Sequence, residues 1–191
     1  MRTSSYIIFA LLCLLLLSGA CSDSTKQIRM RNIELKQDIY SSGIIDISSK
    51  LTFPTAPTEI NICFKPNTYW LGLGSAEKFG IKFSNQYGQY IEIGYDVYRQ
   101  LFFIECRHSS SSEAFVDIPT QQYFINEADR LDMRIVLDTT TIALSSMDGA
   151  VELSNLYFFS AEFNKVELYA ETGKVFVESI SIKQIQQQSF D

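Results

Sequence analysis

The chain has 191 residues, of which 46% are hydrophobic, 13% aromatic and 20% charged. This is the composition of one globular domain rather than of a disordered or membrane-embedded chain. Acidic residues outnumber basic ones by 22 to 16, so no basic patch is available to meet a phosphate backbone, and nucleic acid is excluded as a partner. A single histidine and four widely spaced cysteines predict no metal site and no cofactor.

The amino terminus has the organisation of a secretory signal. Arg2 precedes an apolar run over residues 6–17 that is too short to span a bilayer, and small residues follow it. The sequence Leu-Ser-Gly-Ala-Cys that ends at Cys21 resembles the box at which bacterial lipoproteins are cleaved and acylated. We therefore expect residues 1–20 to be removed and Cys21 to carry a lipid that anchors the protein to the bacterial outer membrane at the cell surface. Ordinary cleavage, leaving a secreted or periplasmic protein, is the alternative.

The rest of the chain is predicted to form one domain with polar ends. Residues 21–32 are rich in Ser, Asp, Thr, Lys and Gln and predict a polar tether. The domain is expected over residues 33–186, and residues 187–191 form a polar tail that is expected to fray.

The first half of the domain is predicted to contain two early strands. A loose apolar alternation over residues 43–53 predicts one of them, which ends at Pro54 and Pro57 because proline cannot donate to a central ladder. Residues 58–64 predict the next strand, and the aromatic and glycine residues at 69–74 lead away from it.

The centre of the chain predicts a three-stranded antiparallel meander. Alternating runs rich in aromatic and β-branched residues lie at 79–84, 89–94 and 101–106. The turn Gln86-Tyr87-Gly88 and a polar connection at residues 95–100 separate them.

More strands follow the meander. A serine-rich loop and short extended segments at residues 114–118 and 123–126 precede the cleanest alternation in the chain, Leu131–Asp138. Asp148-Gly149 supplies the positive φ angles of a tight hairpin, and residues 165–185 predict a closing hairpin. Turn signals recur about every ten residues and no helical period is sustained, which predicts an all-β antiparallel β-sandwich of the jelly-roll or concanavalin-like kind.

Two cysteines lie within predicted strands of the mature chain, Cys63 and Cys106. They would form a disulfide if their strands were neighbours in an oxidising compartment. The alternative is a pair of small buried thiols in the core.

Several of these motifs resemble the carboxy-terminal β-sandwich of glycoside hydrolase family 32, the fructan- and sucrose-cleaving invertases, levanases and inulinases. They are Phe79-Gly80, Gly94-Tyr95-Asp96, Cys106-Arg107-His108, the strand ending in Asp138 and the Asp148-Gly149 turn. The resemblance implies the same sandwich and a link to fructan use.

The chain also departs from the family pattern. Cys106, His108 and Ala143 stand where the family has aspartate, serine and glutamate. The motifs of the family's catalytic propeller, Trp-Met-Asn-Asp-Pro and Arg-Asp-Pro, are missing. Glu105-Cys106 resembles the propeller's acid/base pair but lies in a sandwich strand with no nucleophile motif beside it. The resemblance therefore implies a protein that is not an enzyme.

Binding of a sugar requires flat aromatic side chains for stacking and polar side chains for the hydroxyl groups. Trp70 is the first candidate, with a core position as its alternative. Tyr90 and Tyr98 also lie in or beside the loops of the meander. The candidate carbohydrate-binding residues are Tyr69, Trp70, Tyr87, Tyr95, Asp96 and Arg99.

Hydrolysis of a glycoside requires two carboxyl groups, one of them with a raised pKa. The candidates alternate with apolar residues, so we expect them to face solvent, as we expect of His108 in its serine-rich loop. They are Glu92, Asp96, Glu105, Asp132 and Asp138.

Three functional hypotheses follow. The first is a non-catalytic, surface-anchored protein that binds carbohydrate, a fructan such as levan or inulin, or supports a partner that does. The second is a structural protein that docks on another envelope protein. The third is a glycoside hydrolase.

Overall fold

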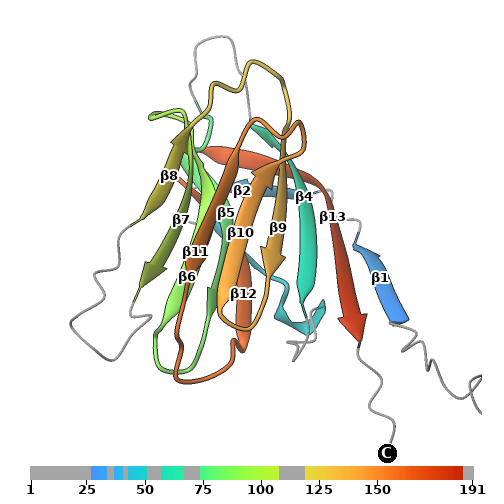
Figure 1. Cartoon of the computed structure of the whole chain (residues 1–191). Helices are drawn as coiled ribbons and strands as arrows, with labels where there is room; N and C mark the ends of the chain where they lie inside the picture. The colour runs from blue at the N-terminus through green and yellow to red at the C-terminus, as the bar shows by residue number, and fades with distance from the viewer. Residues whose placement is uncertain are drawn as a thin grey trace, which may run out of the picture. The chain divides into compact units, whose positions relative to one another are not determined.

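Strands make up nearly all of the regular structure in the part of the chain that the computed structural model describes. It describes residues 27–33, 37–40, 43–50, 57–66, 74–107 and 119–186, and the helical structure among them is one 3-10 turn, Ser48–Lys50. Figure 1 shows the strands in two facing layers. The strands are β1 (Gln27–Ile33), β2 (Gln37–Tyr40), β3 (Gly43–Asp46), β4 (Thr58–Pro66), β5 (Lys78–Ser84), β6 (Tyr90–Asp96), β7 (Leu101–Arg107), β8 (Thr120–Tyr123), β9 (Leu131–Leu137), β10 (Thr141–Ser146), β11 (Glu152–Leu156), β12 (Lys165–Glu171) and β13 (Lys174–Gln186).

The layers are two sheets. Among the described residues, one sheet has seven strands in the order β1-β13-β4-β9-β10-β11, with β2 also beside β13, and the other has six in the order β3-β12-β5-β6-β7-β8. Neighbouring strands such as β5 and β6, or β4 and β9, run antiparallel. The predicted all-β antiparallel sandwich is confirmed.

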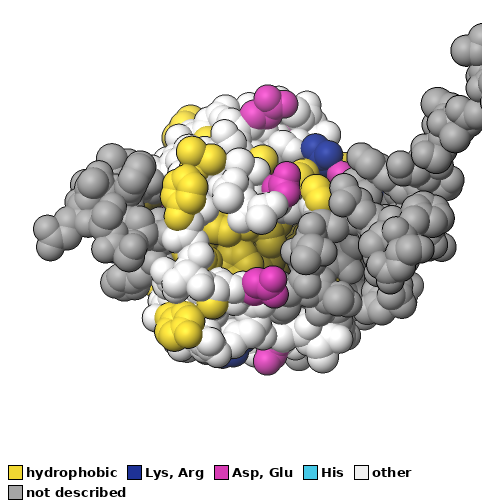
Figure 2. Space-filling view, turned by 60° about the horizontal axis from the view of Figure 1, so that its bottom comes forward, with side chains coloured by type: hydrophobic (Ala, Val, Ile, Leu, Met, Phe, Trp, Pro, Cys, Tyr) yellow, Lys and Arg dark blue, Asp and Glu magenta, His cyan; other side chains and the backbone are white. Residues whose placement is uncertain are grey.

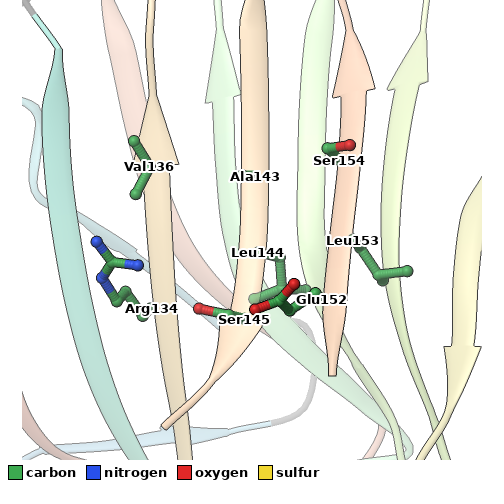
Figure 3. A pocket seen from close by; sticks show the side chains of 8 residues that line it. All are labelled: Arg134, Val136, Ala143, Leu144, Ser145, Glu152, Leu153 and Ser154. Atoms are coloured by element: carbon green, nitrogen blue, oxygen red, sulfur yellow. The ribbon is translucent and has the colours of Figure 1, made fainter. Parts of the chain in front are cut away.

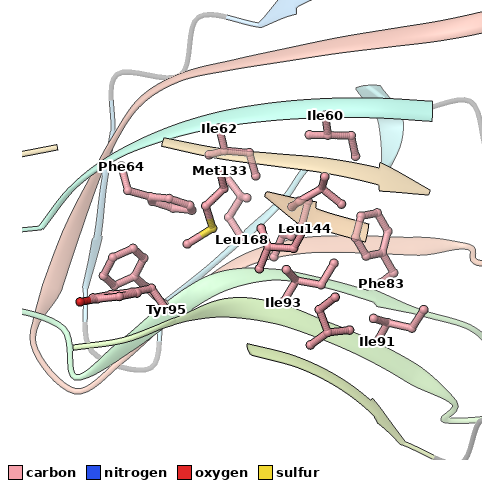
Figure 4. Packing of buried hydrophobic residues seen from close by; sticks show 14 of the residues in the cluster. Ile60, Ile62, Phe64, Phe83, Ile91, Ile93, Tyr95, Met133, Leu144 and Leu168 are labelled. Carbon is pink, nitrogen blue, oxygen red and sulfur yellow. The ribbon is translucent and has the colours of Figure 1, made fainter. Parts of the chain in front are cut away.

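The core lies between the two sheets because alternate side chains of each strand point inward. Figure 4 shows Ile60, Ile62 and Phe64 of β4 facing Ile93 and Tyr95 of β6 across the gap. Each fully buried aliphatic or aromatic side chain of this kind stabilises the fold by about 1.5–3 kcal/mol.

Two glycines bring β5 and β6 unusually close together. Gly80 lies opposite Gly94 in the ladder, on the face of the six-stranded sheet away from the core. A Cβ atom on Gly80 would lie 1.9 Å from the Ile93 carbonyl oxygen, and one on Gly94 would lie 2.2 Å from the Phe79 carbonyl oxygen. Both positions therefore exclude every residue with a side chain, which gives a physical reason for the glycines of the Phe79-Gly80 and Gly94-Tyr95-Asp96 motifs.

A side chain closes the seam between β8 and β11, which belong to different sheets. The Gln122 Nε2 donates to the Ala150 carbonyl oxygen at 3.1 Å, and its Oε1 accepts from the Glu152 backbone N–H at 3.2 Å. The carboxamide of Gln122 thus stands where a backbone peptide group would stand in a continuous ladder.

The strand boundaries differ from the predicted ones in three places. Residues 27–33 form β1 rather than part of the tether, because Ile28 and Met30 alternate with arginines in a strand period. β6 runs two residues further, to Asp96, because the ladder with β5 continues to Lys78. β8 ends at Tyr123 rather than beginning there, because its partner is β7.

Several sequence predictions lie outside the described residues. They are the signal and Cys21 at the amino terminus, the serine-rich loop with His108 and residues 114–118, the tail at 187–191, and Tyr69 and Trp70. Within the described part, no helix is long and apolar enough to cross a membrane.

The two described cysteines are buried and not joined by a disulfide. Cys63 belongs to β4 and Cys106 to β7, so they lie in opposite sheets. The Cys63 thiol donates to Glu178 Oε2 at 3.2 Å. Burial, with this carboxylate, raises the pKa of Cys63 to about 12. Of the two alternatives, buried free thiols are correct, but only Cys106 belongs to the core, whereas Cys63 lies beside charged side chains on the outer face of its sheet.

Candidate carbohydrate-binding site

Tyr95 is a core residue, which corrects its assignment as a ligand-binding residue. It is 3% exposed, and its ring centroid lies 5.2 Å from that of Phe102. Its hydroxyl donates to the Phe124 carbonyl oxygen at 2.8 Å. The sequence prediction failed because it ended the strand at Gly94, whereas β6 continues and strand alternation turns Tyr95 toward the core on the same face as Ile93.

The remaining described candidates lie at two ends of β6. Tyr87 is 65% exposed in the turn between β5 and β6, where its N–H donates to Asn85 Oδ1 at 3.0 Å. Asp96 and Arg99 lie at the other end of the seven-residue β6, a separation of roughly 20 Å at 3.3 Å per residue. The structure thus brings Asp96 and Arg99 together and leaves Tyr87 apart from them.

The loop after β6 holds Asp96 and Arg99 against each other and presents Tyr98. The Arg99 backbone N–H donates to Asp96 Oδ1 at 2.8 Å, and Arg99 Nε lies 3.8 Å from Asp96 Oδ2. Tyr98 is 89% exposed. Gln100 closes the loop with a φ of 54°, a left-handed conformation that costs a residue with a side chain about 1–2 kcal/mol.

A pocket of about 270 Å³ lies beside this loop. It is lined by Glu77, Lys78, Asp96, Tyr98 and Glu171. Its floor comes from three neighbouring strands, because Lys78 pairs with Asp96 on one side and with Glu171 on the other. Its wall is fixed by backbone hydrogen bonds from Val97 N–H to the Glu77 carbonyl oxygen at 2.8 Å and from Glu77 N–H to the Glu171 carbonyl oxygen at 3.0 Å.

Sequence reasoning missed Glu77, Lys78 and Glu171 as site residues. No local signal could have found them, because they come together only through the pairing of β12 with β5. Tyr98 was visible as a loop tyrosine, and it is exposed and lines the pocket.

Lys78 is the centre of a charge cluster at the base of the pocket. Its Nζ lies 2.7 Å from Glu92, 3.8 Å from Glu171 and 4.0 Å from Glu105, and 4.4 Å from the centroid of the Phe103 ring. Burial acts to lower the pKa of Lys78, but the hydrogen-bonded Glu92 and the other two carboxylates outweigh it and raise that pKa. Lys78 therefore stays charged and neutralises part of the acidic lining.

Glu92 corrects the expectation that the strand carboxylates face solvent. It lies on the outer face of the sheet but is only 8% exposed, because Lys78 and Lys82 both approach it. Asp132 also has a partner, since Arg130 donates to its two oxygens at 2.8 Å. Each of these carboxylates is thus held by a cation.

The shifted carboxyl groups give no support to the hydrolase hypothesis. The pKa of Glu59 is lowered, chiefly by its hydrogen bond from Arg134. The pKa of Asp148 is lowered by hydrogen bonds from Ser146 and Ala150. A general acid requires a shift in the opposite direction. Among the described residues, no group of three His, Cys, Asp or Glu side chains could hold a metal ion.

A second hollow lies on the outer face of the seven-stranded sheet. It measures about 300 Å³, and it exists because Ala143, Ser145 and Ser154 are small. Figure 3 shows Arg134 on the β9 side and Glu152 on the β11 side of Ser145. The hollow contains no aromatic side chain, so it lacks the stacking surface that the pocket beside Tyr98 has. It is lined by Arg134, Val136, Ala143, Leu144, Ser145, Glu152, Leu153 and Ser154.

The end of the sandwich that carries the β5–β6 turn is apolar. Figure 2 looks onto this end and shows hydrophobic side chains at the centre of a hollow, with acidic side chains around it. The connection from β11 to β12 packs here, and its Tyr157, Phe159 and Phe163 rings have centroids 5.0–5.5 Å apart. Tyr157 and Phe163 are buried and close the core here, while Leu156 and Phe158 are exposed.

Comparisons with known proteins agree with this fold. The family model described as "Glycosyl hydrolases family 32 C terminal" matches residues 20–184. A levanase of Bacillus sp. (strain L7) is 27% identical over 149 residues, which are 76% of this chain and 14% of the levanase.

Solved structures show the same architecture. An exo-inulinase of Aspergillus awamori superposes with a TM-score of 0.65 at 14% identity, covering 86% of this chain and 30% of the inulinase. A β-fructofuranosidase of Schwanniomyces occidentalis, solved with fructosyl-erythritol, superposes with a TM-score of 0.60 at 18% identity, covering 85% and 33%. The chain thus spans only a minor part of each relative, and the likeness to the solved structures is one of fold. The chain belongs to the family of glycosyl hydrolase family 32 C-terminal domains.

Proposed function

We propose that this protein is a non-catalytic accessory β-sandwich that binds carbohydrate in the pocket beside Tyr98. One observation carries the proposal: Tyr98, 89% exposed, stands at the rim of a pocket whose other lining residues are charged. A sugar ring can stack on the tyrosine while Glu77, Asp96 and Glu171 accept hydrogen bonds from its hydroxyl groups.

The family supports fructan as the substrate class. A levanase is 27% identical to this chain over 149 residues, and the fold resembles a part of an exo-inulinase and of a β-fructofuranosidase. Levan and inulin are therefore the first ligands to test. The chain matches the sandwich domain of the family, and its sequence lacks the motifs of the catalytic propeller. Both observations support a role that is not enzymatic.

The predicted anchor fits this role. A lipid on Cys21 would keep the sandwich at the bacterial cell surface, where it could retain a polysaccharide for other proteins to use. Mass spectrometry of the mature amino-terminal peptide tests this part. A peptide that begins at Cys21 without a thioether-linked lipid would contradict it.

The test of binding is isothermal titration with levan and inulin, with dextran as an unrelated glucan. Tyr98→Ala is expected to weaken binding roughly tenfold or more, since an aromatic contact is worth about 0.5–1.5 kcal/mol beyond its buried area. Tyr87→Ala is the matched control, because it removes an exposed tyrosine from the other end of β6. If no polysaccharide gives heat with the wild-type protein, the proposal is wrong.

The alternative of a docking protein is favoured by the apolar hollow in Figure 2. Leu156 is exposed at that end. The docking alternative would be supported if Leu156→Asp abolished association with an envelope fraction and the wild-type protein bound no sugar. The hydrolase alternative would require release of reducing sugar that disappears when a carboxylate is replaced.

A further inference from the structure

We infer that Tyr123 is a second stacking residue of the site, and that the site prefers two or more consecutive sugar units to a single one. The inference rests on the proposed function, because it takes the pocket beside Tyr98 as the first sugar position. It adds a second sugar-binding position, which lies on a different strand. It also adds a preference for longer ligands.

Tyr123 is exposed and lies next to the loop that carries Tyr98. It is 63% exposed and ends β8, where it pairs with Leu101, the first residue of β7. Because Leu101 directly follows the Tyr98 loop, the end of β8 and that loop are neighbours. The Tyr123 hydroxyl donates to Gln100 Oε1 at 2.9 Å.

Tyr123 and Gln100 are held in place before any ligand arrives. The Phe124 N–H donates to the Gln100 carbonyl oxygen at 2.7 Å, and Tyr95 donates to the Phe124 carbonyl oxygen at 2.8 Å. The left-handed Gln100 is thus bonded through both its backbone and its side chain, which offsets the cost of its conformation. A platform fixed in this way loses little entropy on binding.

The surface beside Tyr123 suits a neutral polyol. Gln100 lies there, and its Oε1 is engaged by Tyr123 while its carboxamide nitrogen can donate to a sugar oxygen. This contrasts with the charged pocket, which Tyr98 lines together with Glu77, Lys78 and Glu171. A chain of sugar units would therefore place one unit in the charged pocket and the next on the neutral platform.

The experiment measures affinity as a function of ligand length. Fructose, 1-kestose and nystose are titrated into the wild-type protein, Tyr123→Ala, Tyr123→Phe and the control Tyr87→Ala, with chemical shifts or heat as the readout. For the wild type we expect at least a tenfold gain in affinity from fructose to nystose. Tyr123→Ala should lose that gain and keep the affinity for fructose. Tyr123→Phe keeps the ring but not the hydrogen bond to Gln100, so its affinity for nystose should fall only a few-fold.

The outcomes separate this inference from the proposed function. If Tyr98→Ala abolishes binding but Tyr123→Ala shows the length dependence of the wild type, the second position is wrong and the first stands. Equal affinity of the wild type for fructose and nystose also overturns the second position. Failure of the wild type to bind any of these sugars, or levan or inulin, overturns both. Because Tyr123 is exposed, we expect its variants to fold. Thermal melts with the same Tm as the wild type will verify this.

Discussion

Replacing Gly80 by alanine tests the close approach of β5 and β6. The added Cβ would lie 1.9 Å from the Ile93 carbonyl oxygen and 2.7 Å from the Gly94 Cα. Both are backbone atoms, so no side-chain rotation can relieve the contact.

The size of the effect follows from the geometry. A carbon atom and a carbonyl oxygen in adjacent strands normally lie about 3.3 Å apart or more, so the strands would have to separate locally by about 1.4 Å. That displacement breaks the hydrogen bonds of the adjacent ladder positions, at about 0.5–1.5 kcal/mol each, and adds an overpacking cost of about 1–3 kcal/mol. We expect Gly80→Ala to lower the free energy of unfolding by about 3 kcal/mol or more, which is about 6–12 °C in Tm for a protein of this size.

Urea unfolding followed by circular dichroism measures this loss. Gly88→Ala is the matched control: Gly88 has a φ of +76° but nothing within 4 Å of the added Cβ. It should cost only the left-handed conformation, about 1–2 kcal/mol. A Gly80→Ala protein within 1 kcal/mol of the wild type, or one less affected than Gly88→Ala, would refute the steric argument.

Three further predictions concern other parts of the molecule. Gln122→Ala should remove both hydrogen bonds of the β8–β11 seam and speed hydrogen exchange of the β8 amides; exchange that is unchanged would show that the seam does not need them. The Cys63 thiol, with its pKa raised to about 12, should not react with a thiol reagent at pH 8 until urea unfolds the protein, whereas prompt reaction of the native protein at Cys63 would contradict its burial. Arg134 lowers the pKa of Glu59, so the pair stabilises the fold above the unfolded pKa of Glu59 and ceases to do so as the pH falls through the lowered native value. Arg134→Met should therefore cost less than about 1 kcal/mol at pH 7, because the pair is partly exposed, and close to nothing at pH 2; an equal loss at both pH values would rule out the ion pair as the cause.

The strands of the meander could be predicted from the sequence because each has a period of two and ends at a turn signal. β9 was equally visible. Of the two positive φ angles expected in the Asp148-Gly149 turn between β10 and β11, only the one at Gly149 is found. β1 was hidden because its alternation is short and lies in a polar stretch. Propensity is a local property, and it locates strands well when both turns and alternation are strong.

The site was less predictable because it depends on register. Arg99 lies in the predicted connection, but Tyr95 and Asp96 were assigned to it through an error of two residues in the end of β6. Alternation correctly predicts that Glu92 lies on the outer face. It does not reveal that Lys78 and Lys82 cover Glu92, because they come from a different strand.

The Gln122 carboxamide has a consequence for how this protein meets other chains. Free backbone groups at the edge of a sheet can recruit a strand from another molecule. At the β8–β11 seam, the side chain of Gln122 binds two such groups, the Ala150 carbonyl oxygen and the Glu152 backbone N–H. Because a side chain rather than a ladder does this, a single substitution could turn a closed seam into an edge that accepts a foreign strand.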